Sequence, residues 1–158
     1  MTETATLAGG CFWGVEELVR KLPGVIDTTV GYAGGTLDNP RYEDVKEGKT
    51  GHAESLQIVF DPSKITFGEI LDFFFRLHDP TTVNRQGNDA GTQYRSAIFY
   101  HDDAQRIAAE SAKERAQPNW PRPIVTEIVP FTNFYEAEDY HQDYLQRYPN
   151  GYTCHYVR

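Results

Sequence analysis

The chain has 158 residues, of which 39% are hydrophobic and 13% are aromatic, and its formal net charge is −8. This composition excludes a disordered chain and fits one globular domain over residues 1–158. The negative charge argues against nucleic acid or an anionic membrane as the main partner. No stretch approaches the roughly 18 apolar residues of a membrane-spanning helix. The start, MTETATLAGG, lacks the basic and apolar segments of a signal peptide, so we expect a soluble, cytoplasmic protein.

Hydrophobic patterns and turn residues predict strands and helices that follow one another unevenly. In chain order we expect a strand at 4–9, a helix at 12–21, a strand at 25–33, a short turn or helix at 42–48, a strand at 52–60, a helix at 66–78, a strand at 94–100, a helix at 102–117, a strand at 123–129, a short helix near 136–147 and an irregular tail over about 148–158. The polar segment at 78–94 is longer than most connections, and such loops are often functional. The mixture predicts an α+β two-layer sandwich in which helices pack on one sheet.

A cysteine stands where the first strand gives way to the first helix, in the stretch TLAGGCFWGVEEL. At a helix N-terminus the unpaired backbone N–H groups and the helix dipole favour a thiolate, which is the nucleophilic form of cysteine. Gly9 and Gly10 permit a tight turn before it. The position therefore predicts that Cys11 is a nucleophile, although a free cysteine can also be a small buried hydrophobe.

Two aromatic residues, Phe12 and Trp13, follow this cysteine directly. Consecutive helical residues point about 100° apart, so the two rings cannot both face the same core. We expect at least one of them to line a pocket beside the thiol, where it would receive a methyl group or a polarizable sulfur.

A single carboxylate, Glu54, falls on the apolar face of the strand at 52–60. A carboxylate on an apolar face is either partnered or raised in pKa by desolvation, and a protonated one can donate a proton. The competing interpretation is a solvated position at the end of the strand.

The remaining polar candidates are less distinctive from the residues alone. In RQGNDAGTQYRS, Asp89 and Tyr94 lie among turn-forming residues, and Tyr42 is one tyrosine of ten. The five histidines are scattered, and none is selected as a partner of Cys11, although His141 in an acidic aromatic segment could line a site. No Cys/His spacing suggests a zinc site.

The second cysteine, Cys154, lies in a Tyr- and Gly-rich tail. A mobile tail thiol can form a disulfide with a reactive one, and a partner can later reduce it. A cysteine pair in a reducing compartment is more often redox-active than structural.

Several of these stretches together resemble the methionine sulfoxide reductase A family. The chain contains GGCFWGVE, GYAGG, NPRYEDV, TGHAES, HDPTT, RQGNDAGTQYRSAI and EAEDYHQDYL. The resemblance covers essentially the whole chain. It implies an α+β sandwich with a mixed sheet around a ferredoxin-like core, and no metal or organic cofactor.

The resemblance also implies roles for individual residues in the reduction of the S epimer of methionine sulfoxide, free or in proteins. Cys11 matches the family nucleophile, which becomes a sulfenic acid, and Glu54 matches the acid that protonates the sulfoxide oxygen. Cys154 matches the recycling cysteine, whose disulfide with Cys11 is reduced by thioredoxin or a similar dithiol protein. The family's three-cysteine relay is excluded, because the chain has two cysteines.

The substrate-binding residues follow in the same way. Phe12 and Trp13 match the aromatic wall that receives the methyl group, Tyr42 and Tyr94 match tyrosines that bind the oxygen, and Asp89 matches the acid that supports the site. A monomer is expected. The alternatives from other classes are a Cys–His hydrolase and a non-catalytic module that binds oxidised methionine.

Overall fold

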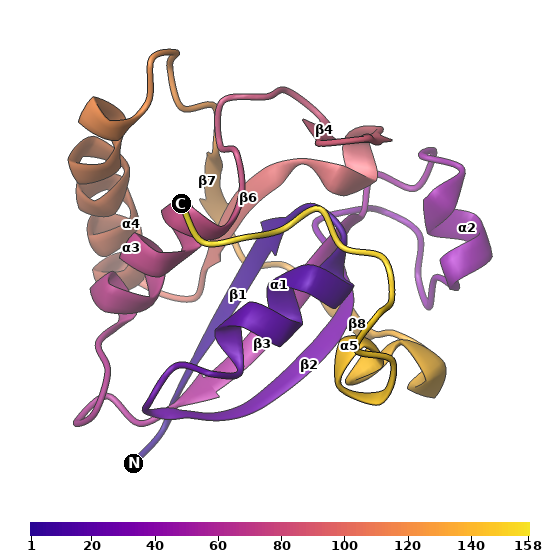
Figure 1. Cartoon of the computed structure of the whole chain (residues 1–158), viewed down its shortest axis with the longest axis horizontal. Helices are drawn as coiled ribbons and strands as arrows, with labels where there is room; N and C mark the ends of the chain where they lie inside the picture. Colours follow the sequence, from indigo (N-terminus) through magenta and orange to yellow (C-terminus); the bar gives the residue numbers. More distant parts are fainter.

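The computed structural model describes residues 1–158 and contains one large mixed sheet (Figure 1). Its six strands lie in the order β7-β6-β1-β3-β2-β8. Neighbouring strands are antiparallel except β6 and β7, which are parallel. In chain order the strands are β1 (Glu3–Gly9), β2 (Val25–Ala33), β3 (Ala53–Phe60), β6 (Ser96–Tyr100), β7 (Glu127–Pro130) and β8 (Phe134–Glu136).

The helices complete the second layer. The main ones are α1 (Phe12–Val19), α3 (Phe67–Leu77) and α4 (Asp103–Ala116), and the short ones are α2 (Tyr42–Lys46) and α5 (Tyr144–Arg147). The order β1-α1-β2-β3-α3-β6 with the strands arranged β6-β1-β3-β2 is the ferredoxin-like pattern. The predicted α+β class, mixed sheet and ferredoxin-like core are therefore confirmed. None of these helices combines the length and the apolar character that a membrane span requires.

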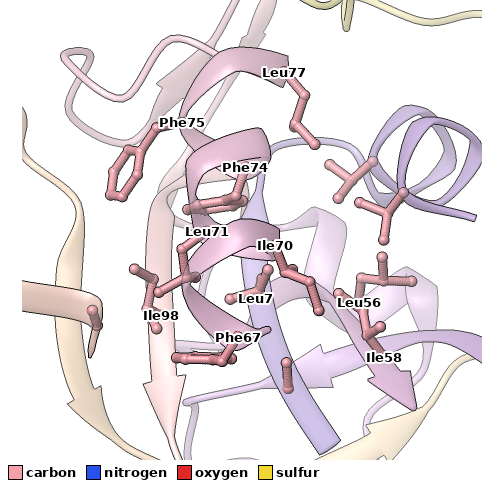
Figure 2. Close-up of a cluster of buried hydrophobic side chains, with 14 of the residues drawn as sticks. Leu7, Leu56, Ile58, Phe67, Ile70, Leu71, Phe74, Phe75, Leu77 and Ile98 are labelled. Carbon is pink, nitrogen blue, oxygen red and sulfur yellow. The ribbon is translucent and has the colours of Figure 1, made fainter. Parts of the chain in front are cut away.

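One hydrophobic core holds the two layers together (Figure 2). It combines the inward residues of β1 and β3 with the apolar faces of α1, α3 and α4. This cluster completely buries Leu56 and Ile58 of β3 together with Ile70 and Phe74 of α3. Glu54 precedes them on the same strand face, so the core side of the sheet also carries a carboxylate.

The predicted helix starts are confirmed at two places. Thr66 caps α3 by accepting a hydrogen bond from the Glu69 backbone N–H, and the Glu69 carboxylate accepts one from the Thr66 N–H. Asp102 caps α4 by accepting from the Gln105 N–H.

The structure differs from two predictions near the end of the chain, one for the start of a strand and one for a helix. The strand expected at 123–129 begins only at Glu127. The helix expected near 136–147 is replaced by β8, a short 3₁₀ turn at Asp139–His141 and the single turn of α5. The physical reasons are edge pairing of β8 with β2 and the left-handed backbone of Asp143, φ 55°, which interrupts a continuous helix.

Candidate active site

Cys11 is the N-cap residue of α1 and is separated from the end of β1 by Gly10 alone, as the sequence predicts. The preceding Gly10 has φ +97°, a conformation that favours glycine, and a Cβ there would lie 2.7 Å from Gln86 Cγ. Only 7% of Cys11 is exposed. The turn therefore presents the sulfur at the head of the helix but in a nearly closed site.

The sequence predicts that the helix N-terminus favours the thiolate form of Cys11, and this prediction is wrong. Burial raises the pKa of Cys11 well above its ordinary value, and the negative charge of Glu54 raises it further. The backbone N–H of Trp13 acts in the opposite direction but does not outweigh them. Cys11 is thus a neutral thiol at neutral pH in the free protein.

Glu54 lies in β3 with its side chain buried and only 2% exposed. Its Oε1 accepts a hydrogen bond from the Phe12 backbone N–H at 3.2 Å. Burial raises the pKa of this carboxyl to about 8, against a lowering by that hydrogen bond. Glu54 is therefore largely protonated at neutral pH and available as a proton donor.

The two aromatic residues after the cysteine differ in their surroundings. Phe12 is 1% exposed and belongs to the main core. Trp13 is half-buried, its indole N–H donates to His141 Nδ1 at 3.0 Å, and its ring stacks on Tyr144 with centroids 3.9 Å apart. Trp13 is thereby held by two residues of the segment between β8 and the tail.

Two tyrosines, Tyr42 and Tyr94, lie in the same region as Cys11 and Glu54. The backbone N–H of Tyr42 donates to Glu138 Oε2 at 2.9 Å, and the Tyr32 hydroxyl donates to the other oxygen of that carboxylate at 2.9 Å. Burial and the charge of Glu54 raise the pKa of Tyr42 to about 12 and that of Tyr94 further. Both Tyr42 and Tyr94 remain protonated donors.

Asp89 comes from a small hairpin within the long loop, formed by β4 (Arg85–Gln86) and β5 (Asp89–Ala90). Its Oδ2 accepts a hydrogen bond from the Tyr152 hydroxyl at 3.2 Å. Burial raises the pKa of Asp89, and this hydrogen bond lowers it. The hairpin therefore links the loop to the tail.

These side chains enclose one cavity of about 110 Å³. Its wall contains all the predicted site residues except Cys154, together with one more, Tyr152: it is formed by Cys11, Phe12, Trp13, Tyr42, Glu54, Asp89, Tyr94 and Tyr152. Tyr152 is not among the residues predicted from the sequence, and the only signal that could have indicated it is its position two residues before Cys154. No group of three or more His, Cys, Asp or Glu side chains is arranged to hold a metal ion.

Cys154 lies beside this cavity as a free, half-buried thiol. Its Sγ is 3.8 Å from the Gln86 carbonyl oxygen, 3.9 Å from His155 Nδ1 and 4.0 Å from Asp89 Oδ2. Asp89 thus contacts both Tyr152 and Cys154, and the second thiol stands next to the wall of the site that holds the first.

Known proteins are similar to this chain in sequence and in fold. The family model described as "Peptide methionine sulfoxide reductase" matches residues 3–158. A relative from Nocardia farcinica, "Peptide methionine sulfoxide reductase MsrA", is 57% identical over 100% of this chain and 93% of its own length.

Solved structures are also similar to this chain. Mxr1 from Saccharomyces cerevisiae in reduced form is 47% identical, with a TM-score of 0.95 over 99% of this chain and 92% of that one. The same protein in complex with Trx2 aligns with a TM-score of 0.68 and 37% identity over 99% of this chain and 90% of that one. Since the family model spans nearly the whole chain and the fold agrees, the chain belongs to the peptide methionine sulfoxide reductase family.

Proposed function

We propose that this protein reduces the S epimer of methionine sulfoxide, free or in proteins, to methionine. The observation that carries the proposal is the cavity of about 110 Å³ in which a thiol, a protonated carboxyl and aromatic rings converge. This volume suits the methyl sulfoxide end of the substrate. The family name of the relatives supports the reaction class.

In the first step the Cys11 sulfur attacks the sulfoxide sulfur. Glu54 gives its proton to the sulfoxide oxygen as negative charge develops there, and the Tyr42 and Tyr94 hydroxyls stabilise the same oxygen by hydrogen bonds. The Cys11 thiol gives its proton to the Glu54 carboxylate, which becomes a neutral carboxyl again. The oxygen, now a hydroxyl, leaves the substrate sulfur for Cys11, so the thiol is oxidised to a sulfenic acid and the sulfoxide is reduced to a thioether.

The aromatic residues orient the substrate for this attack. Trp13, fixed by His141 and Tyr144, forms the half-buried wall that receives the methyl group. Phe12 closes the site from the core side. A chiral cavity accepts one arrangement of methyl group, oxygen and peptide chain, and the family resemblance supports the proposal that this arrangement is that of the S epimer.

In the second step the Cys154 thiol condenses with the sulfenic acid and water leaves, which produces a Cys11–Cys154 disulfide. A dithiol protein of the thioredoxin class reduces this disulfide by exchange and restores both thiols. Support comes from the position of Cys154 beside the cavity and from the relative that is seen in complex with Trx2. No histidine lines the cavity, whereas a Cys–His hydrolase needs one beside its nucleophile.

The test is an assay with the separate S and R epimers of methionine sulfoxide, with dithiothreitol and thioredoxin compared side by side. We expect turnover of the S epimer with both reductants and none of the R epimer. Equal turnover of both epimers would contradict the assignment. Mass spectrometry after a single turnover without reductant should find the Cys11–Cys154 disulfide, and an acyl adduct on Cys11 would indicate a hydrolase instead.

A further inference from the structure

The C-terminal segment that carries Cys154 crosses the molecule over α1 and ends beside α3 (Figure 1). At its far end the Arg158 backbone N–H donates to the Arg76 carbonyl oxygen at 2.9 Å. Near the cavity the Tyr152 hydroxyl donates to Asp89. Between these contacts His155 is the one buried side chain, with 7% exposed, while Tyr156 and Val157 are largely exposed. The proposed function leaves this buried histidine without a role.

The ring of His155 has a defined tautomer. Its Nε2 lies 2.6 Å from the carbonyl oxygen of Gly9, which can only accept a hydrogen bond, so the ring proton is on Nε2. Burial lowers the pKa of His155 to about 4, against a raising by this hydrogen bond, so the ring is neutral at neutral pH. Nδ1 is then unprotonated, and it lies 3.9 Å from the sulfur of Cys154.

Two glycines of the GGCFWG stretch make room for this ring. A Cβ on Gly10 would lie 3.2 Å from His155 Nε2. A Cβ on Gly14, inside α1, would overlap His155 Nδ1 and the Thr153 hydroxyl. Glycine inside a helix is less favourable than alanine, so helix stability does not explain Gly14, whereas the close approach of His155 and Thr153 does.

We infer that His155 anchors the C-terminal segment to the head of α1 through the Gly9 carbonyl and so positions Cys154 for its reaction with Cys11. His155 is a positioning residue, since it acts through the neighbouring thiol. The inference rests on the proposed function for the reaction it serves. In that reaction the Cys154 sulfur bonds to the Cys11 sulfur, the S–O bond of the sulfenic acid breaks, and the hydroxyl leaves as water with the Cys154 proton.

Three substitutions of His155 distinguish the roles of its two ring nitrogens, Nε2 and Nδ1. The amide nitrogen of glutamine reaches about as far as Nε2, whereas that of asparagine reaches only about as far as Nδ1. His155→Gln should therefore keep the hydrogen bond to Gly9, and His155→Asn and His155→Ala should lose it.

The first measurement needs no turnover. The rate at which iodoacetamide alkylates Cys154 in the reduced protein is followed by peptide mass spectrometry. We expect an increase of about tenfold in His155→Ala and His155→Asn, because the half-buried thiol becomes mobile, and an increase below about twofold in His155→Gln. Equal rates in all four proteins would overturn the inference. Protection of Cys154 in His155→Asn but not in His155→Gln would also overturn it, because Nδ1 would then be the anchor.

The second measurement separates the two chemical steps. After one equivalent of sulfoxide is added without reductant, methionine formation and disulfide formation are timed, and dimedone traps the sulfenic acid. In His155→Ala we expect methionine formation within about twofold of the parent and disulfide formation slower by about 10- to 100-fold, since displacement of a reacting group costs rates of this order. Equal slowing of both steps, or unchanged disulfide formation, would contradict the inference. If the parent forms no disulfide, the proposed function fails, while the alkylation experiment still decides whether His155 is the anchor.

A glycine pair supplies a matched control that leaves His155 intact. Gly14→Ala should release the segment and accelerate alkylation of Cys154, although alanine favours a helix. Gly68→Ala in α3 should leave the alkylation rate unchanged, because a Cβ there meets nothing closer than 3.7 Å. Circular dichroism of each variant checks that the fold is retained. An unchanged alkylation rate of Cys154 in Gly14→Ala would contradict the proposed docking of the ring against α1.

Discussion

Phe12 donates its backbone N–H to Glu54 at 3.2 Å, across 42 residues of sequence. This bond joins the first turn of α1 to the middle of the central sheet. It uses one of the unpaired N–H groups of the helix terminus to hold the carboxyl that faces Cys11. This one hydrogen bond consequently ties the residue next to the nucleophile to the proposed acid. Substitutions at Glu54 therefore affect both the chemistry and the local structure.

Glu54→Gln should slow methionine formation by about 10²- to 10⁴-fold, because the amide keeps the shape of the side chain but has no acidic proton to give. The measurement is single-turnover methionine formation, which excludes the recycling step. Glu110→Gln on the exposed face of α4 is the control and should keep the parent rate. A Glu54→Gln rate within a few-fold of the parent would remove Glu54 from the role of acid.

The same carboxyl should make stability depend on pH. Its pKa is about 8 in the folded protein, against an ordinary value of 4.5 for the unfolded chain. Between these two pH values the folded protein therefore keeps the Glu54 proton that the unfolded chain has lost. The stabilisation is fully present below about pH 4.5 and is lost as pH rises through about 8, a change of about 5 kcal/mol. Urea unfolding of the parent and of Glu54→Gln from pH 5 to 9 should show the parent losing stability relative to the variant as pH rises. Parallel curves would mean that Glu54 is ionised in the folded state.

Cys154→Ser should separate the two halves of the catalytic cycle. The variant should still form about one equivalent of methionine, because Cys11 and the acid are intact, but it should lose thioredoxin-dependent turnover. Dimedone should then label Cys11, since the sulfenic acid has no second thiol to meet. Continued turnover with thioredoxin at the parent rate would show that Cys154 is not the recycling thiol.

Trp13→Ala should lower kcat/KM for the S epimer by about 10- to 200-fold, which is the range for loss of contact with one methyl-sized group. The change should fall mainly on KM, because the indole contacts the substrate before and during the reaction. Trp120 is the other tryptophan of the chain and lies outside the cavity, so Trp120→Ala is the matched control for kcat/KM. Equal effects of the two substitutions would point to general destabilisation.

Local patterns made much of this arrangement predictable. The period of two in β3 places Glu54 on the core face, and the glycines before Cys11 mark the start of α1. Both features depend on neighbours in sequence. The mixed sheet and the ferredoxin-like core came from the family resemblance, because pairing between distant strands leaves little trace in one sequence.

Other features depend on contacts that no local pattern records. The raised pKa of Cys11 arises from burial and from Glu54, both set by tertiary packing, so the helix position alone predicts the wrong direction. The segment near 136–147 is rich in helix-forming residues, yet Glu138 accepts hydrogen bonds from Tyr32 and Tyr42. The role of Tyr152 in the cavity wall was hidden for the same reason, because the tail is irregular.

The cavity wall draws on residues from Cys11 near the start of the chain to Tyr152 near its end. During synthesis the chain emerges from its N-terminus, and the strands β1, β2, β3 and β6 are complete by Tyr100. A nascent chain can therefore build the central sheet well before it possesses a closed cavity or a second thiol. Until then Cys11 stands in an incomplete site, and the full catalytic cycle becomes possible only when the last few residues fold back over α1.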